Sequence, residues 1–270
     1  MKKRLDLHTT GSSHSGTKGF FEKVLRKFKI LSHLALLPAI YLTASLCLGL
    51  SLVPGIAFFR YLIEITEKQT TLIQNLALGF SIAVGYFLYG FTLIFVTPTV
   101  NFLIRGKLKP WRGPYYSVET FKWYLHNGLT YLVRYTFLEF ATPTPLSQLF
   151  YRMMGMKIGK GTTINSTYIS DPSLIELGDH VTIGGSVTIV AHYGQGGLMV
   201  ISPVKIGSGC TVGLRATIMG GVTLGDNVRI MPNSVVLPKT IIPAGESWGG
   251  VPAVKIETGA NAQLPKLAIS

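Results

Sequence analysis

Acidic residues are scarce in this chain. Its 270 residues include 12 Asp and Glu against 25 Lys and Arg, so the formal net charge at pH 7 is +13. Such an excess indicates an anionic partner, either nucleic acid or a lipid surface. Charged residues make up only 14% of the chain and hydrophobic residues 47%, which excludes intrinsic disorder. Long apolar runs favour lipid over nucleic acid.

Cysteine is nearly absent as well. The two cysteines are Cys47, in an apolar run, and Cys210, in a glycine-rich region. Two such distant thiols exclude a disulfide framework, a zinc ribbon and a redox pair. The 30 glycines follow no collagen triplet, so we expect them to serve the turns of a repeat.

The N-terminal region, residues 1–29, combines a polar tail with a short basic segment. Phe20, Val24 and Phe28 recur at helical spacing among lysines and arginines. This pattern is typical of a basic amphipathic helix on an anionic membrane surface. A secretory signal is not indicated, because the apolar run that follows starts late and is too long.

Two stretches contain no Asp, Glu, Lys or Arg, namely residues 30–59 and residues 69–104. About 20 apolar residues span the hydrocarbon core, so we expect residues 30–104 to form a hairpin of two transmembrane helices. Two buried core helices are the alternative. Basic residues precede the first stretch and follow the second, as Arg105, Lys107, Lys109 and Arg112. This distribution predicts that both ends face the cytoplasm.

Residues 105–152 form a linker that is crowded with aromatic side chains. Rings such as Trp123, Tyr124 and Tyr135 are interleaved with basic residues, and amphipathic rings collect at the level of the lipid headgroups. We expect an interfacial helix here, with a groove for a lipid substrate as the alternative. The run Thr142 to Pro145 should end that helix.

The last part of the chain carries a repeat of six residues. Every sixth residue from Ile206 is apolar: Ile206, Val212, Ile218, Leu224, Ile230, Val236, Ile242 and Trp248. A small or β-branched residue, beginning with Cys210, stands four positions after most of them. Neither an α-helix nor a simple hairpin has this period. It predicts a coil with three flat faces whose stacked turns bury one continuous core.

The repeat resembles a known family. The run IGSGCTVGLRATIMGGVTLGDNVRIMPNSVV, residues 206–236, is similar to the left-handed parallel β-helix of hexapeptide-repeat acyltransferases, and WGGVPAVKI, residues 248–256, to their closing segment. The predicted fold class is therefore membrane α plus all-β. The transmembrane hairpin and interfacial helix would precede a left-handed β-helix domain at residues 153–257, with a tail at 258–270.

A second resemblance concerns the order of these parts. Hydrophobic spans, an aromatic linker and the run beginning at Pro145 together resemble the membrane-bound terminal modules of ε-poly-L-lysine synthetase-like proteins. This resemblance implies a bacterial inner membrane, with the β-helix domain on the cytoplasmic side.

The repeat is interrupted once, by the insertion VAHYGQGGLMVISP at residues 190–203. We expect this insertion to leave the coil as a loop that carries His192. In hexapeptide acyltransferases, a histidine in this place deprotonates the acceptor, and imidazole is suited to that task near neutral pH. A loop histidine held by backbone or water is the alternative. His180 is predicted to be a solvated turn residue, and Cys210 a core residue.

The same resemblance suggests donor-binding residues. The amide near Gly213 and Leu214 would face the acyl carbonyl, and Lys239 and Lys255 would bind phosphates or a carrier protein. The sequence departs from the family at Pro232, which has no N–H to offer. The donor is therefore either acyl-CoA, with an acetyl or longer chain, or a carrier-protein thioester, and no metal is expected.

These sequence features are compatible with three functions. The first is a membrane-anchored acyltransferase that uses a cytosolic thioester and a hydroxyl or amine acceptor, built as a homotrimer with each active site between neighbours. The second is a metal enzyme on the same coil, for which His180 and His192 supply too few histidines. The third is a membrane scaffold without catalytic activity.

Overall fold

The computed structural model describes residues 16–257, so the predicted tails at 1–15 and 258–270 lie outside the described residues. The chain forms two compact units. The first contains the helices up to Met156, together with the segments Ser170–Leu174 and Gly194–Val200. The second contains the rest of the repeat region.

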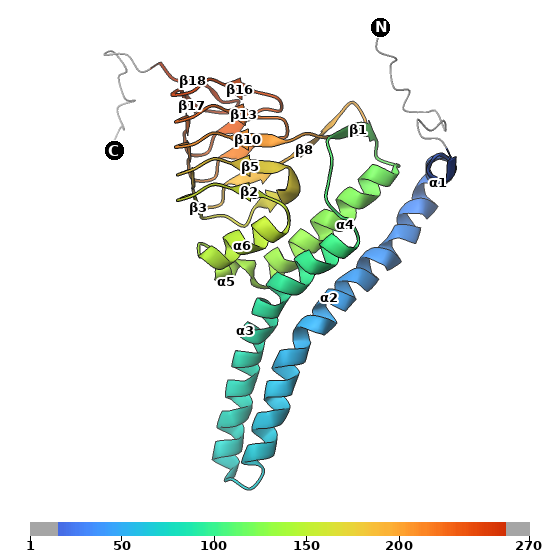
Figure 1. Ribbon diagram of the computed structural model, residues 1–270, viewed down its shortest axis with the longest axis vertical. Helices are drawn as coiled ribbons and strands as arrows, with labels where there is room; N and C mark the ends of the chain where they lie inside the picture. Colours follow the sequence, from blue (N-terminus) through green and yellow to red (C-terminus); the bar gives the residue numbers. More distant parts are fainter. Residues whose placement is uncertain (1–15, 258–270) are drawn as a thin grey trace, which may run out of the picture. The chain divides into compact units, whose positions relative to one another are not determined.

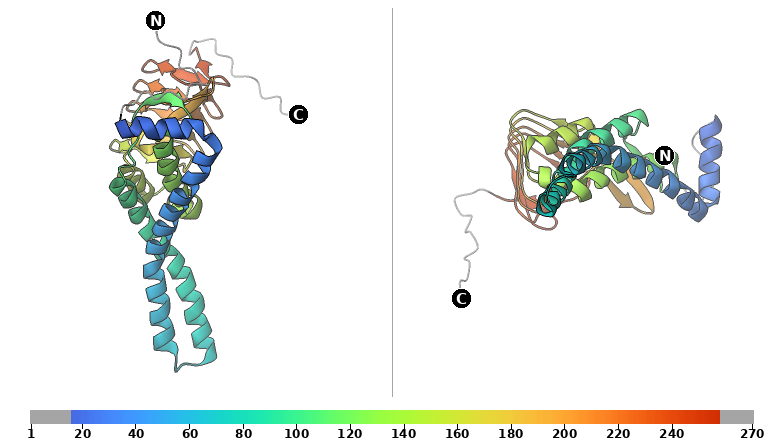
Figure 2. Two further views of the ribbon diagram at one scale, coloured as in Figure 1. Left: turned by 90° about the vertical axis from the view of Figure 1, so that its right-hand side faces the viewer. Right: turned by 90° about the horizontal axis from the view of Figure 1, so that it is seen from below.

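The first unit begins with three helices: α1 (Gly16–Lys27), α2 (Lys29–Thr66) and α3 (Thr71–Leu103). In Figure 2, α1 lies crosswise to α2, and α2 and α3 run as a hairpin joined by a short connection. Both long helices continue through their prolines, Pro38, Pro54 and Pro98.

The two helices confirm the predicted pair of long apolar segments. Leu36–Thr66 and Thr71–Leu103 are long and apolar enough to cross a membrane. Only 11% of the most apolar window of α2 is buried, and 28% of that of α3. A core helix of a soluble protein would bury most of its apolar surface, so this exposure argues against the alternative of two core helices.

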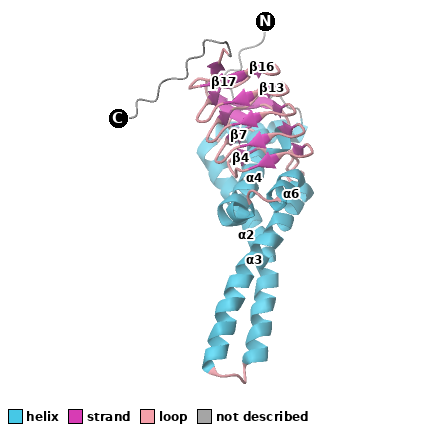
Figure 3. Cartoon of the chain, turned by 90° about the vertical axis from the view of Figure 1, so that its left-hand side faces the viewer, coloured by secondary structure: helices cyan, strands magenta, loops and turns pink. Residues whose placement is uncertain are grey.

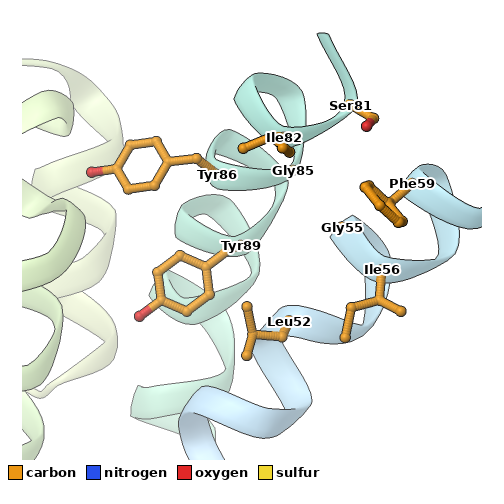
Figure 4. A pocket seen from close by; sticks show the side chains of 9 residues that line it. All are labelled: Leu52, Gly55, Ile56, Phe59, Ser81, Ile82, Gly85, Tyr86 and Tyr89. Atoms are coloured by element: carbon orange, nitrogen blue, oxygen red, sulfur yellow. The ribbon is translucent and has the colours of Figure 1, made fainter. Parts of the chain in front are cut away.

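A shallow apolar pocket of about 460 Å³ lies between α2 and α3 (Figure 4). Gly55 of α2 faces Gly85 of α3 there, which lets the two backbones approach closely. Tyr86, at its edge, donates a hydrogen bond of 2.8 Å to the carbonyl oxygen of Thr136. No acidic or basic side chain is among the residues that line this pocket.

The aromatic linker contains more than one helix. It begins with strand β1 (Trp111–Pro114), followed by α4 (Val118–Val133), the π-helix η1 (Arg134–Leu138), α5 (Glu139–Ala141) and α6 (Pro145–Met153). Ser117 caps α4 by accepting a hydrogen bond of 3.1 Å from the Thr120 amide. The helix ends at Ala141, before the Thr-Pro run, as predicted. A strand at residues 111–114 was not predicted, and it shortens the expected helix at its start.

A buried polar cluster joins α4 to the rest of the first unit. His126 Nδ1 lies 3.1 Å from Asn101 Oδ1. The Asn127 amide donates to Asp171 Oδ1 at 2.6 Å, and its oxygen accepts from the Asp171 backbone N–H at 3.1 Å. His126 is fully buried, and its Nε2 has no hydrogen-bond partner within residues 16–257. Burial lowers the pKa of His126 to about 4, against the opposing effect of the Asp171 carboxylate.

This lowered pKa predicts that acid destabilises the first unit. The unfolded chain takes up a proton at His126 below about pH 6.5, whereas the folded chain does so only near pH 4. Above pH 6.5 the neutral His126 costs the folded state nothing relative to the unfolded chain. As the pH falls from 6.5 toward 4, the free energy of unfolding decreases, by about 3 kcal/mol in total. Thermal unfolding midpoints in detergent should therefore fall more steeply in this window for the wild type than for His126→Gln. Parallel profiles for the two proteins would contradict this prediction.

The second unit is a stack of short strands arranged on three faces, and we call this three-sided stack the prism. One face holds β2 (Lys157–Ile158), β5 (Ile175–Leu177), β10 (Val204–Ile206), β13 (Thr223–Leu224) and β16 (Ile241–Ile242), which Figure 1 shows stacked in this order. The next holds β3 (Thr163–Ile164), β6 (Thr182–Ile183), β11 (Thr211–Val212), β14 (Arg229–Ile230), β17 (Ser247–Gly249) and β18 (Val254–Lys255). The third holds β4 (Ile169–Ser170), β7 (Thr188–Val190), β12 (Thr217–Ile218) and β15 (Val235–Val236), of which β4 and β7 are labelled in Figure 3.

Successive strands lie on the three faces in turn. Each coil of the prism therefore contains three of the six-residue repeats, which we call hexads. Ile206 pairs with Leu224, Val212 with Ile230, and Ile218 with Val236, all in parallel register. Seven of the eight predicted apolar positions, from Ile206 to Ile242, are buried, as is Cys210, whereas the eighth, Trp248 in the last coil, is half-buried. Both predictions are confirmed: the hexads form a continuous core, and Cys210 belongs to it. Burial also raises the pKa of the Cys210 thiol, which disfavours the reactive thiolate form.

Several corners of the prism hold a residue other than glycine with positive φ. His180 is one of them, at φ 54° and exposed, as predicted for a solvated turn. Lys239, at φ 65°, is another.

The insertion at residues 190–203 is a hairpin rather than an irregular loop. Strands β8 (His192–Gln195) and β9 (Leu198–Ile201) are joined by Gly196 and Gly197, whose φ angles of 56° and 73° suit a tight turn. The sheet order is β1-β9-β8. Despite the insertion the coil keeps its register, since Ile206 still pairs with Leu177.

Candidate functional site

His192 lies at the edge of the prism where the hairpin leaves the coil. The preceding Ala191 is fully buried, and its carbonyl accepts a hydrogen bond of 2.8 Å from the Ser202 amide, which closes the base of the hairpin. A Cβ placed on Gly220 would lie 2.9 Å from the His192 backbone nitrogen. His192 therefore sits directly against the next coil, and its side chain is half-buried.

The same edge holds Lys239, one of the predicted donor-binding residues. Its backbone N–H donates to the Gly220 carbonyl at 3.1 Å. Its ammonium nitrogen lies 5.9 Å from the centre of the ring of Tyr193, within the range of a cation–π interaction. The structure thus brings His192 and Lys239 to one edge, where both backbones lie next to Gly220. Tyr193, which no sequence pattern indicated as a site residue, is 7% exposed.

Leu214 lies at a different edge of the same prism, between β11 and β12. It is 50% exposed, and its carbonyl accepts from the Asn233 amide at 2.8 Å. Its own N–H donates to no group in the part of the chain that the structure describes. By contrast, the neighbouring Gly213 amide is engaged with the Ile230 carbonyl at 2.8 Å. The free N–H of Leu214 is a candidate donor for a developing negative charge.

The register identifies the positions above and below Leu214. Because Val212 pairs with Ile230 and with Ile183, Leu214 corresponds to Pro232 in the following coil and to Gly185 in the preceding one. Pro232 has no N–H. The next coil therefore offers no amide N–H at the position that corresponds to Leu214.

Lys255 is not at either of these positions. It lies on β18, and its ammonium group donates to Glu246 Oε1 at 2.5 Å. The Trp248 indole N–H donates to the other oxygen of Glu246 at 2.8 Å. Hydrogen bonding from Lys255 lowers the pKa of the Glu246 carboxyl, and the pair is surface-exposed on the lysine side. Lys255 thus helps to close the last coil, on a face away from the edge of His192.

The two histidines of the prism lie at different corners, His180 between β5 and β6 and His192 after β7. Within residues 16–257, no three His, Cys, Asp or Glu side chains gather as they would around a metal ion.

A family model, the hexapeptide repeat of succinyl-transferase, matches residues 203–238. The predicted hexapeptide-repeat resemblance is thereby confirmed. Delta-poly-L-ornithine synthetase of Acinetobacter baumannii is 26% identical over 210 residues, which cover 77% of this chain and 15% of that protein. This coverage is more than the prism alone accounts for, so the similarity extends into the helical part and agrees with the second predicted resemblance.

Other similarities cover less of the chain. Serine acetyltransferase of Helicobacter pylori is 31% identical over 115 residues, 41% of this chain and 66% of that protein. Gamma carbonic anhydrase 2 of Arabidopsis thaliana is 33% identical over 109 residues, 36% of this chain and 34% of that protein. A hexapeptide-repeat acetyltransferase of Vibrio cholerae, solved with acetyl-CoA, aligns with a TM-score of 0.43 at 21% identity, covering 57% of this chain and 96% of that one. The chain spans less than two thirds of each curated relative.

Proposed function

We propose that the chain is a membrane-anchored acyltransferase. It moves an acyl or aminoacyl group from a cytosolic thioester to a hydroxyl or amine acceptor near the membrane, with His192 as general base. The position of His192 at the prism edge, beside Tyr193 and Lys239, carries this proposal. The hexapeptide repeat and the similarity to an acetyltransferase support it.

The chemistry requires a proton to leave the acceptor as it attacks the thioester carbonyl. The imidazole of His192 takes that proton, and the carbonyl oxygen becomes negatively charged in the tetrahedral intermediate. The free N–H of Leu214 can donate to this oxygen. Collapse of the intermediate breaks the carbon–sulfur bond and releases the thiol, which takes up the proton from His192. No covalent intermediate with the protein is needed.

The two groups lie at different edges of one prism, so a single chain does not bring them to one substrate. We therefore propose a homotrimer in which His192 of one protomer faces the Leu214 edge of its neighbour. Chains carrying His192→Ala and chains carrying Leu214→Pro should each retain only a small residual activity alone. Co-expressed and purified together, they should regain activity, because some shared sites then contain both intact groups. A monomer in mild detergent with full activity, or mixed trimers without any recovery, would contradict this arrangement.

The apolar helices α2 and α3 would place the catalytic prism at the cytoplasmic face of a bacterial inner membrane. The basic residues after α3, such as Arg105 and Lys107, support this orientation. Lys239 is proposed to contact the donor, which is acyl-CoA or a carrier-protein thioester. The pairing of Lys255 with Glu246 leaves Lys255 a weaker candidate for donor binding than Lys239.

The proposed function is tested in cells that carry either the wild-type chain or His192→Ala. Mass spectrometry of lipids and small metabolites should reveal an acylated product that accumulates only with the wild type. Purified wild-type protein should also release free thiol from the donor in the presence of that acceptor. Identical product profiles at equal protein levels would favour a non-catalytic scaffold instead.

A further inference from the structure

A second pocket, of about 690 Å³, lies in the first unit at the end of α3. Four cationic side chains line it: Arg105, Lys107 and Lys109 follow α3, and Lys122 comes from α4. No acidic side chain is among the lining residues. Like charges around one pocket repel each other, and a bound anion would relieve that repulsion.

Helix electrostatics do not explain this cluster. A cation next to the C-terminus of α3 would interact favourably with the helix dipole, but that effect fades within one turn. Lys122 belongs to the N-terminal half of α4, where the dipole offers a cation no stabilisation. The helix dipoles therefore do not account for the positive charge that Arg105, Lys107, Lys109 and Lys122 bring to one pocket.

One wall of the pocket adds a polar group. Asn101 lines the pocket and is only 4% exposed. Its backbone carbonyl accepts from the Gly106 amide at 2.8 Å, and its side-chain oxygen lies 3.1 Å from His126 Nδ1. With its oxygen turned toward the buried histidine, the Asn101 amide group can present its N–H atoms to an anion in the pocket.

Apolar side chains flank the basic ones. Phe102, which lines the pocket, is 79% exposed, and the adjacent Leu103 and Ile104 are 71% and 40% exposed. These residues continue the apolar surface of α3, whose span ends at Leu103. A ligand that combines a negative charge with hydrocarbon chains would match both the cationic lining of the pocket and the apolar side chains beside it.

We propose that this pocket binds the phosphate of an anionic membrane lipid, with Arg105, Lys107, Lys109 and Lys122 around the phosphate and the lipid chains along α3. The inference rests on the membrane insertion included in the proposed function, but not on acyl transfer. Cytoplasmic leaflets carry anionic lipids that attract basic segments of this kind. Soluble phosphates share the chemistry of the headgroup, so the experiment must separate the two sources.

Native mass spectrometry of the full chain in neutral detergent micelles tests the proposal. The protein is titrated with phosphatidic acid, with phosphatidylcholine and with inorganic phosphate. Phosphatidic acid should bind saturably and more tightly than phosphatidylcholine, and inorganic phosphate should not displace it at equal concentration. Since each basic group near an anionic lipid contributes about 1 kcal/mol, Lys107→Gln combined with Lys122→Gln should weaken binding on the order of 30-fold.

Arg112→Gln is the matched control, because Arg112 is exposed and close in sequence but does not line the pocket. Its affinity for phosphatidic acid should stay close to that of the wild type. Equal weakening by the control and the double variant, or no saturable binding, would overturn the proposal. Displacement by inorganic phosphate would assign the pocket to a soluble phosphate and overturn the lipid assignment. Binding is measured without donor or acceptor, so failure here is distinguishable from failure of the proposed catalysis.

Discussion

Replacement of His192 by alanine is expected to lower the turnover number by about 10²–10⁴-fold, the usual contribution of a general base. The prism should remain folded in this variant. His192 begins the hairpin strand β8 and is only half-buried, whereas the core is built from the hexad side chains. Lost activity should therefore come from the missing base and not from lost structure.

His180→Asn is the control for this variant. His180 is an exposed corner residue with φ 54°, and asparagine tolerates that conformation. Turnover by the control should match the wild type, and both variants should unfold at the wild-type temperature. Undiminished transfer by His192→Ala would mean that another group, such as the acceptor's own amine, manages the proton.

Much of the prism was predictable because its repeat is local. A period of six residues specifies which side chains face inward, and the parallel register then follows from stacking three hexads per coil. Ile206, Val212 and Ile218 are buried where the pattern placed them. The insertion was predictable as a break in register. Its form was also signalled, since Gly196 and Gly197 between two short apolar or aromatic segments are typical of a tight hairpin turn.

Contacts between residues distant in sequence could not be predicted in the same way. Asn127 meets Asp171, and His126 meets Asn101, yet neither pair follows from a local pattern. Lys255 looked like an isolated cation that could bind the donor, but it pairs with Glu246. Donor binding by Lys255 is therefore less favoured than its sequence position indicated. The sequence of strand β1 shows no alternation of apolar and polar residues that would predict a strand. Such features depend on how elements pack, which a single sequence does not specify.

Replacement of Leu214 by proline should lower the turnover number by about 10²–10³-fold, the typical effect of removing one oxyanion donor. Proline deletes the N–H that makes no hydrogen bond within the described chain. The backbone should accept it, because Pro232 already occupies the corresponding position in the next coil. The residue before it is Gly213, which tolerates the restriction that proline imposes on its neighbour.

Leu214→Ala separates the amide from the side chain. Alanine keeps the N–H and removes most of the exposed apolar surface, so its effect should appear in the Michaelis constant for the donor, with little change in turnover. Leu214→Pro should instead lower turnover, because the missing hydrogen bond is made mainly in the transition state. Equal losses in the two variants would assign the role to the leucine side chain. Full turnover by Leu214→Pro would remove this amide from the reaction, and with it the reason for placing His192 of one protomer against the Leu214 edge of another.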